Sequence, residues 1–201
     1  METVLILDFG AQYSQLIARR VREQNVYCEV KPCSISPDEI RELAPIGIIL
    51  SGGPQSVYES VSLHVDPALF SLGIPVLGIC YGCQLMAYSL GGTVAAATEA
   101  TAREYGKTLT EFDTESAIFH GLPSSSVTWM SHGDYISQVP DGFTVTAKTA
   151  VCPTAAMACP EKKLYGVQFH PEVQHTVQGS EILRRFLYSV CGASGDWTMA
   201  D

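Results

Sequence analysis

The sequence predicts an α/β fold: an open, mostly parallel central sheet with helices on both faces, plus a smaller antiparallel strand set in the second half. Three observations lead to this prediction. Short apolar runs alternate with helix-like segments through the first half of the chain, which is the order of repeated β-α units. The runs are apolar throughout, as strands covered by helices on both faces are. The second half instead contains strand-like runs separated by turn signals.

Four β-α units are expected in the first half. The second helix begins at Ser36-Pro37, and the third strand stops at Ser51-Gly52-Gly53-Pro54. The expected strands are Val4–Leu7, Tyr27–Lys31, Ile46–Leu50 and Ile74–Ile79. The expected helices are Gln12–Gln24, Pro37–Leu43, Asp66–Ser71 and Tyr81–Leu90. Successive units of this kind imply a parallel, flavodoxin-like sheet.

The second half changes character. Pro140-Asp141-Gly142 and the segment from Pro160 to Lys163 are turn signals between strands. The last periodic segment, Ser180–Val190, is expected to be a closing helix with one apolar face. Residues 1–190 are therefore expected to form one domain and residues 191–201 a tail. The expected strands are Thr93–Phe112, Ser126–Met130, Phe143–Lys148, Thr154–Ala158 and Leu164–Phe169.

Composition excludes several classes of function. The chain has 201 residues and a net charge of −9, which disfavours nucleic acid or an anionic membrane as its main partner. It has seven cysteines, an odd number with no regular spacing, which does not suggest a disulfide framework. A reduced, cytoplasmic setting is therefore expected. The segment Met1–Asp8 is expected to be a first strand and not a signal peptide. No apolar run approaches the ~20 residues of a membrane span.

The segment Gly78-Ile79-Cys80-Tyr81-Gly82 follows the fourth apolar run and precedes a helix-like pattern. This is the layout of a nucleophile elbow with cysteine in place of serine. Flanking glycines let the backbone turn sharply and leave room around the central side chain. The dipole and free N–H groups of a helix start favour the thiolate form of a cysteine there. Cys80 is therefore the expected nucleophile.

Other roles for Cys80 stay open at this point. It could be a buried packing cysteine, although packing alone does not require flanking glycines. Cys80 and Cys83 also form a C-x-x-C at a helix start, the motif of thiol–disulfide oxidoreductases, but that role leaves Gly78 and Gln84 unexplained. Zinc binding is disfavoured, because no second C-x-x-C or paired histidine occurs at ligand spacing, and no metal site is expected.

Gln168-Phe169-His170-Pro171-Glu172 supplies a base and an orienting carboxylate. Pro171 disfavours a helical conformation at His170, and in extended backbone His170 and Glu172 project to the same side. Glu172 can then hold one ring nitrogen and leave the other for Cys80, which is the logic of a catalytic triad. Cys80, His170 and Glu172 together indicate a Cys-His-Glu hydrolase.

Two further segments are candidates for the same site. Ser51-Gly52-Gly53-Pro54 is either an ordinary turn or an oxyanion loop, in which the Gly53 N–H would pair with the Tyr81 N–H. It is not interpreted as a pyrophosphate loop, because Pro54 removes an N–H and Gln55 stands where such loops carry an acid. Trp129–Asp134 is either a polar turn or the rim of a site for a small polar substrate.

These motifs together resemble the class I (triad-type) glutamine amidotransferases. Gly78–Gly82 and Gln168–Glu172 are similar to the class as a whole. Three longer segments resemble one branch of it, the glutaminase domains of the GMP synthase family. They are Leu7–Val21, Trp129–Asp134 and Phe169–Thr176.

The resemblance implies an enzyme that hydrolyses L-glutamine. Cys80 would attack the side-chain amide and form a γ-glutamyl thioester. His170, oriented by Glu172, would protonate the departing ammonia and then activate water. Gly53 and Tyr81 match the oxyanion donors. The positions that hold the substrate are matched by Gln84, Ser131, His132, Gly133 and Asp134.

The resemblance also implies a partner. Family members carry an ATP pyrophosphatase (synthetase) domain, which uses ATP and magnesium to adenylate XMP and aminates it to GMP with the released ammonia. No cofactor is expected in this chain itself, and residues 191–201 resemble the linker to that domain. Two other functions stay open: an amidotransferase for another acceptor, and a non-enzymatic flavodoxin-like binding module.

Overall fold

The computed structural model describes residues 1–10, 13–53, 56–58, 64–97 and 103–198. Its helices are α1 Ser14–Glu23, α2 Pro37–Leu43, α3 Tyr81–Ser89 and α4 Gly179–Arg185, with short turns η1 Pro67–Ser71, η3 Pro160–Lys162 and η4 Phe186–Val190. Its strands are β1 Thr3–Asp8, β2 Tyr27–Pro32, β3 Gly47–Leu50, β4 Val76–Ile79, β5 Thr93–Ala95, β6 Glu104–Phe112, β7 Ser125–His132, β8 Tyr135–Gln138, β9 Thr144–Lys148, β10 Ala156–Cys159 and β11 Leu164–Val167.

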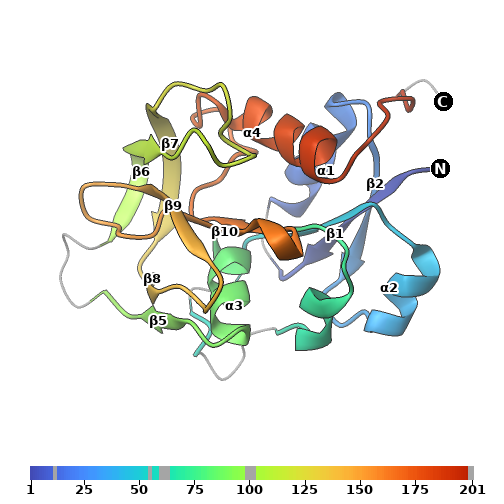
Figure 1. The fold of residues 1–201 in the computed structure, drawn as a ribbon, viewed down its shortest axis with the longest axis horizontal. Helices are drawn as coiled ribbons and strands as arrows, with labels where there is room; N and C mark the ends of the chain where they lie inside the picture. The colour runs from blue at the N-terminus through green and yellow to red at the C-terminus, as the bar shows by residue number, and fades with distance from the viewer. Residues whose placement is uncertain (11–12, 54–55, 59–63, 98–102, 199–201) are drawn as a thin grey trace.

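One half of the main sheet is parallel. Strands β2, β1, β3, β4 and β11 lie side by side in that order and all run the same way. Strands β3, β4 and β11 are buried along their whole length, as strands covered on both faces are. Helices α1 and α4 cover one face, and α2 and α3 cover the other (Figure 1). The predicted α/β fold with a parallel core is confirmed.

The other half of the same sheet is antiparallel. Beyond β11 the order continues through β10, β9, β6 and β7, each antiparallel to its neighbour. A separate pair, β5 and β8, lies beside α3 (Figure 1). The predicted antiparallel set is therefore present, but most of it extends the central sheet instead of standing apart from it.

Several predicted element boundaries differ from the structure. Thr93–Phe112 is not one strand, because its two ends pair with different partners: β5 with β8, and β6 with β7 and β9. The expected helix Asp66–Ser71 is a 3₁₀ turn that begins at Pro67, and the closing helix ends in a π-helical turn over Phe186–Val190. The predictions for Gln12, Pro54, Gln55 and residues 98–102 and 199–201 lie outside the described residues.

The topology fixes where a site can form. Strands β3, β4 and β11 are neighbours, so their carboxyl ends meet at the same edge of the sheet. Ser51–Gly53 follows β3, Cys80 follows β4, and Gln168–Glu172 follows β11. The carboxyl edge of an open parallel sheet is where such folds bind ligands.

Candidate active site

Cys80 occupies a strained turn between β4 and α3. Its φ of 53° and ψ of −110° lie in a region that residues other than glycine seldom adopt. The two neighbouring glycines are required by close packing. A Cβ atom on Gly78 would lie 2.6 Å from the Gly82 carbonyl oxygen, and one on Gly82 would lie 2.5 Å from the Leu50 carbonyl oxygen. The turn therefore has the geometry of a nucleophile elbow.

His170 lies between Glu172 and Cys80. Its Nδ1 donates to Glu172 Oε1 over 2.6 Å, and the ring also hydrogen-bonds the Cys80 side chain. Burial by itself lowers the pKa of His170, but the charge and hydrogen bond of Cys80, together with the hydrogen bond and charge of Glu172, outweigh it and raise the pKa from 6.5 to about 11. The arrangement therefore favours the imidazolium form of His170.

The segment that carries His170 and Glu172 is held by backbone contacts from two other elements. The His170 N–H donates to the Trp129 carbonyl over 2.9 Å, and the Thr176 hydroxyl donates to the His170 carbonyl over 2.6 Å. On the helix side, Arg20 Nε donates to the Glu172 carbonyl over 2.9 Å. Arg20 of α1 therefore contacts the segment that carries His170 and Glu172.

A cavity of about 670 Å³ opens beside Cys80. Gly53 and Tyr81 also line it, and a Cβ on Gly53 would lie 2.6 Å from Phe9 Cβ, so the loop needs glycine there. His170 and Glu172 are buried behind Cys80 and do not line the cavity. The expected substrate-binding residues all line it: Gln84, Ser131, His132, Gly133 and Asp134.

Cys83, the second cysteine of the C-x-x-C, does not face this cavity. It is fully buried, and a Cβ atom on Gly166 of β11 would lie only 2.6 Å from its sulfur, so the thiol packs against the sheet. Burial, then the nearby Cys80, raises the pKa of Cys83 well above its ordinary value of 9.0. An inert, packed thiol at this position argues against the redox interpretation of the motif.

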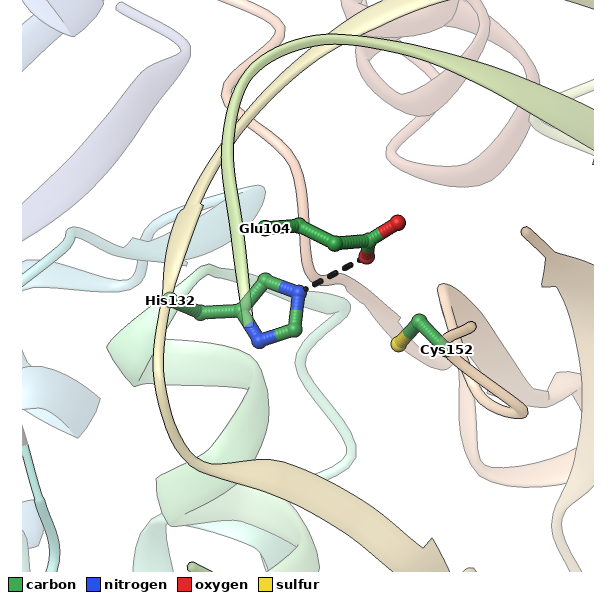
Figure 2. Close-up of side chains that lie close together, drawn as sticks. All are labelled: Glu104, His132 and Cys152. Carbon is green, nitrogen blue, oxygen red and sulfur yellow. Dashed lines mark hydrogen bonds and ion pairs between the residues drawn. The ribbon is translucent and has the colours of Figure 1, made fainter. Parts of the chain in front are cut away.

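A second cluster of chemistry-bearing residues lies near the cavity: Glu104, His132 and Cys152, whose ligand atoms are all within 4.8 Å of one another (Figure 2). Burial, then the charge of Glu104, raises the pKa of Cys152 to about 12, and its thiol donates to the Thr154 carbonyl. Both His132 nitrogens are already engaged, with Glu104 and with the Asp134 carbonyl. No ring nitrogen is left to serve Cys152 as a base, so the cluster does not have the arrangement of a triad.

The same hydrogen bonds argue against a metal at this cluster. Glu104 Oε1 faces His132 Nε2 over 3.0 Å, and Glu104 Oε2 accepts from the Thr149 hydroxyl over 2.7 Å. These groups satisfy one another, and a metal would have to displace each of these bonds. A buried polar network in which every group is hydrogen-bonded is suited to holding neighbouring side chains in position.

Sequence reasoning overlooked two buried residues of the site. Gln168 is fully buried, and its Nε2 lies 3.7 Å from Cys80 Sγ. A signal was available, because Gln168 is a polar residue within an apolar strand end and, two positions before His170, projects to the same side. Glu104 carried no comparable signal, since it contacts His132 only through the pairing of β6 with β7.

The strained cysteine and the buried histidine–carboxylate pair form a Cys-His-Glu arrangement at the carboxyl edge of an α/β sheet. In agreement, the chain belongs to the family described as glutamine amidotransferase class I, whose model matches residues 5–190. Among the described helices, none combines the length and apolar content that a membrane span needs.

Comparison with curated relatives indicates which members of this family the chain resembles closely. The chain is 56% identical over 198 residues to a GMP synthase (glutamine-hydrolysing) of Clostridium botulinum and 54% identical over 198 residues to one of Geobacillus kaustophilus. In each case 98% of this chain is matched, but only 38% of the relative. Among solved structures, a Thermoplasma acidophilum protein provisionally assigned as one subunit of GMP synthase is 32% identical, with a TM-score of 0.85 over 95% of this chain and 94% of that one.

Proposed function

We propose that the chain hydrolyses L-glutamine to glutamate and ammonia through a cysteine thioester. The observation that carries this proposal is the line of hydrogen bonds from Glu172 through His170 to Cys80 at the wall of the cavity. An amide resists attack, so hydrolysis needs a strong nucleophile, a proton for the leaving nitrogen and stabilisation of the oxyanion. The site contains a candidate group for each of these needs.

In the first half of the reaction, the Cys80 thiolate attacks the side-chain carbonyl carbon of glutamine. Negative charge moves to the carbonyl oxygen, where the N–H groups of Gly53 and Tyr81 are the proposed donors. A donor of this kind typically contributes about 3 kcal/mol of transition-state stabilisation. His170 then gives its proton to the nitrogen as the carbon–nitrogen bond breaks. Ammonia departs, and a γ-glutamyl thioester remains on Cys80.

In the second half, neutral His170 takes a proton from water, and the hydroxide attacks the thioester carbon. The carbon–sulfur bond breaks, the thiolate is restored, and the imidazolium forms again beside it. Glu172 holds the ring in one orientation throughout and stabilises its charged form. The proposed substrate contacts come from Gln84 and the Ser131–Asp134 segment, which line the cavity.

We further propose that the ammonia is delivered to a synthetase for the amination of XMP to GMP. The support is the similarity to GMP synthases, of which this chain spans about 38% of the length. The partner would be an ATP pyrophosphatase, either as a domain or as a separate chain, and ATP and magnesium would bind there and not to this chain. This setting would be cytoplasmic.

Residues 191–201 are proposed to lead toward that partner, with residues 1–190 as the amidotransferase domain. The described part of the tail packs on the domain. Ser194 donates through its N–H and its hydroxyl to Glu2, and Trp197 lies against Tyr27 with ring centroids 5.8 Å apart. These contacts would fix the direction in which the chain leaves the domain.

The experiment that tests the proposal measures glutamate release from glutamine by the purified chain, alone and with the cognate synthetase. Conversion of XMP to GMP with glutamine as the nitrogen source is measured in the same mixtures. We expect hydrolysis in the presence of the synthetase and coupled GMP formation. Hydrolysis without any transfer to XMP would leave the glutaminase activity standing and reject XMP as the acceptor.

A further inference from the structure

A continuous path of hydrogen bonds starts at the Cys80 sulfur. Gln168 Nε2 lies 3.7 Å from Cys80 Sγ, within reach of an N–H···S bond. Gln84 Nε2 donates to Gln168 Oε1 over 3.0 Å and also to the Asp134 carbonyl over 3.0 Å. The path therefore connects the nucleophile to the segment between β7 and β8 through two glutamine side chains.

The path continues to a buried carboxylate. His132 Nδ1 lies 2.8 Å from the Asp134 carbonyl, and His132 Nε2 lies 3.0 Å from Glu104 Oε1. The Thr149 hydroxyl closes the far end by donating to Glu104 Oε2 over 2.7 Å. Figure 2 shows the His132 ring pointing at Glu104 within this cluster. Both side chains are buried, so water does not compete for these bonds.

The hydrogen bonds of the two glutamine side chains have only one consistent direction. A backbone carbonyl only accepts hydrogen bonds, so Gln84 must present its NH₂ group, and not its oxygen, to Asp134. The same NH₂ group faces Gln168, which must therefore present its oxygen to Gln84. The NH₂ group of Gln168 is then the part that faces Cys80. The orientation of both amides follows from the network and not from either side chain alone.

We propose that Gln168 is a further catalytic residue, whose side-chain N–H donates to the Cys80 sulfur and stabilises its thiolate form. The proposal rests on the proposed function in one respect, that Cys80 is the nucleophile. No proton is transferred by Gln168. Its bond strengthens while the sulfur carries negative charge, before attack on the amide and again when the thioester breaks, and weakens while the sulfur is acylated.

The surroundings of Cys80 explain why a second donor is useful. The Ser131 carbonyl lies 3.5 Å from Cys80 Sγ and accepts a hydrogen bond from the thiol, so this neighbour interacts favourably with the sulfur only while it carries its proton. The titratable groups around the sulfur among the described residues include His170, with Glu172 behind it, and the buried Cys83. The cavity that Cys80 lines is also lined by the titratable side chains of Tyr81, Arg103, Tyr105, His132 and Asp134. Gln168 thus adds a hydrogen-bond donor that does not titrate and that stabilises the thiolate form of Cys80.

The test is the rate of alkylation of Cys80 by iodoacetamide between about pH 6 and about pH 9, read at the Cys80 peptide by mass spectrometry. Gln168→Met has similar size and no donor. We expect this variant to slow alkylation about tenfold at the acidic end of the range and much less at the alkaline end, because the thiolate loses one charge-assisted hydrogen bond. Thermal unfolding of each variant verifies the fold.

A second variant and a control keep the test decisive. Gln168→Asn retains the amide but withdraws it from the sulfur, and we expect the same shift of the profile to higher pH if the Met variant does not fold. Gln138→Met makes the matched change at an exposed position at the end of β8 and should follow the wild-type profile. A folded Gln168 variant with the wild-type pH profile overturns the proposal, even if its glutamine turnover has fallen.

Failure of this inference is distinguishable from failure of the proposed function. Alkylation requires only the thiol and not glutamine, so the pH profiles decide the role of Gln168 whether or not glutamate is released. Glutamate release by the wild-type chain with its synthetase tests the proposed function separately.

Discussion

Nδ1 of His170 lies 2.6 Å from Oε1 of Glu172, and both side chains are almost completely buried. Only Pro171 separates them in the chain, and a turn at Pro171–Glu172, in place of the extended backbone that was expected, brings the two side chains together. The bond fixes which ring nitrogen is occupied and leaves Nε2 for Cys80. One short segment therefore sets the tautomer, the orientation and the charge of the proposed base.

Glu172→Gln tests this bond. The amide has the same size but no charge, so His170 loses the partner that stabilises its imidazolium. We expect kcat for glutamine hydrolysis to fall on the order of a thousandfold or more, as for a triad that loses its acid. The KM should change little, because Glu172 does not line the cavity. An unchanged kcat would remove Glu172 from the catalytic set.

The two cysteines of the C-x-x-C are expected to differ sharply. Cys80→Ala should abolish glutamine hydrolysis, because it removes the nucleophile. Cys83→Ala should keep most of the activity, since that thiol is fully buried against Gly166 and its raised pKa keeps it neutral. The measurement is glutamate release by both variants at equal folded concentration. Equal loss in both would favour the redox interpretation.

Cys152→Ala distinguishes the two histidine-containing clusters. The pKa of Cys152 is raised to about 12 by burial and by Glu104, and the thiol does not line the cavity, so the variant should hydrolyse glutamine at nearly the wild-type rate. Steady-state kinetics give the answer. Loss of kcat without loss of thermal stability would make Cys152 a participant in the chemistry.

The raised pKa of His170 also predicts a pH dependence of stability. The folded protein keeps the proton up to about pH 11, whereas the unfolded chain releases it near pH 6.5. The stabilisation is therefore complete below pH 6.5 and is lost as the pH rises toward 11. The difference in free energy of unfolding between wild type and His170→Asn should shrink steadily from about pH 7 to about pH 10. A difference that grows with pH would contradict the assigned charge state.

Gly82→Ala tests the packing behind the elbow. An added Cβ would lie 2.5 Å from the Leu50 carbonyl oxygen, which is backbone and cannot move aside cheaply. We expect a loss of about 1–3 kcal/mol in the free energy of unfolding, measured with urea. Gly133→Ala is the control, because its Cβ would meet the Tyr105 hydroxyl at 3.5 Å and Arg103 Nε at 4.0 Å, both ordinary contact distances.

The parallel half of the fold was predictable because its signal is local. Most strands there are short apolar runs followed by a helix, and the turn from β4 into α3 lies where the Gly78–Gly82 motif predicted it. The antiparallel half was less predictable, because pairing depends on contacts distant in sequence. Strand β8 was missed, and Thr93–Phe112 was wrongly taken as one strand, since no local pattern says that β5 and β6 have different partners.

The site divides in the same way. Cys80, His170 and Glu172 lie in two short motifs whose spacing carries their geometry, and the structure brings them together. Gln168 lies inside one of those motifs, but its orientation depends on Gln84, which is 84 positions away. Glu104 reaches the site only through the register of β6 with β7. Such contacts follow from tertiary structure and leave no periodic trace in the sequence.

Labelling with a chloroketone analogue of glutamine tests directly whether Cys80 is the nucleophile of a glutamine-hydrolysing triad. The adduct is located by mass spectrometry of the digested chain. We predict one adduct, on Cys80, whose formation is slowed by excess glutamine and is absent in Cys80→Ala. An adduct on Cys152 or any other cysteine that glutamine competes away, with Cys80 unmodified, would contradict this assignment.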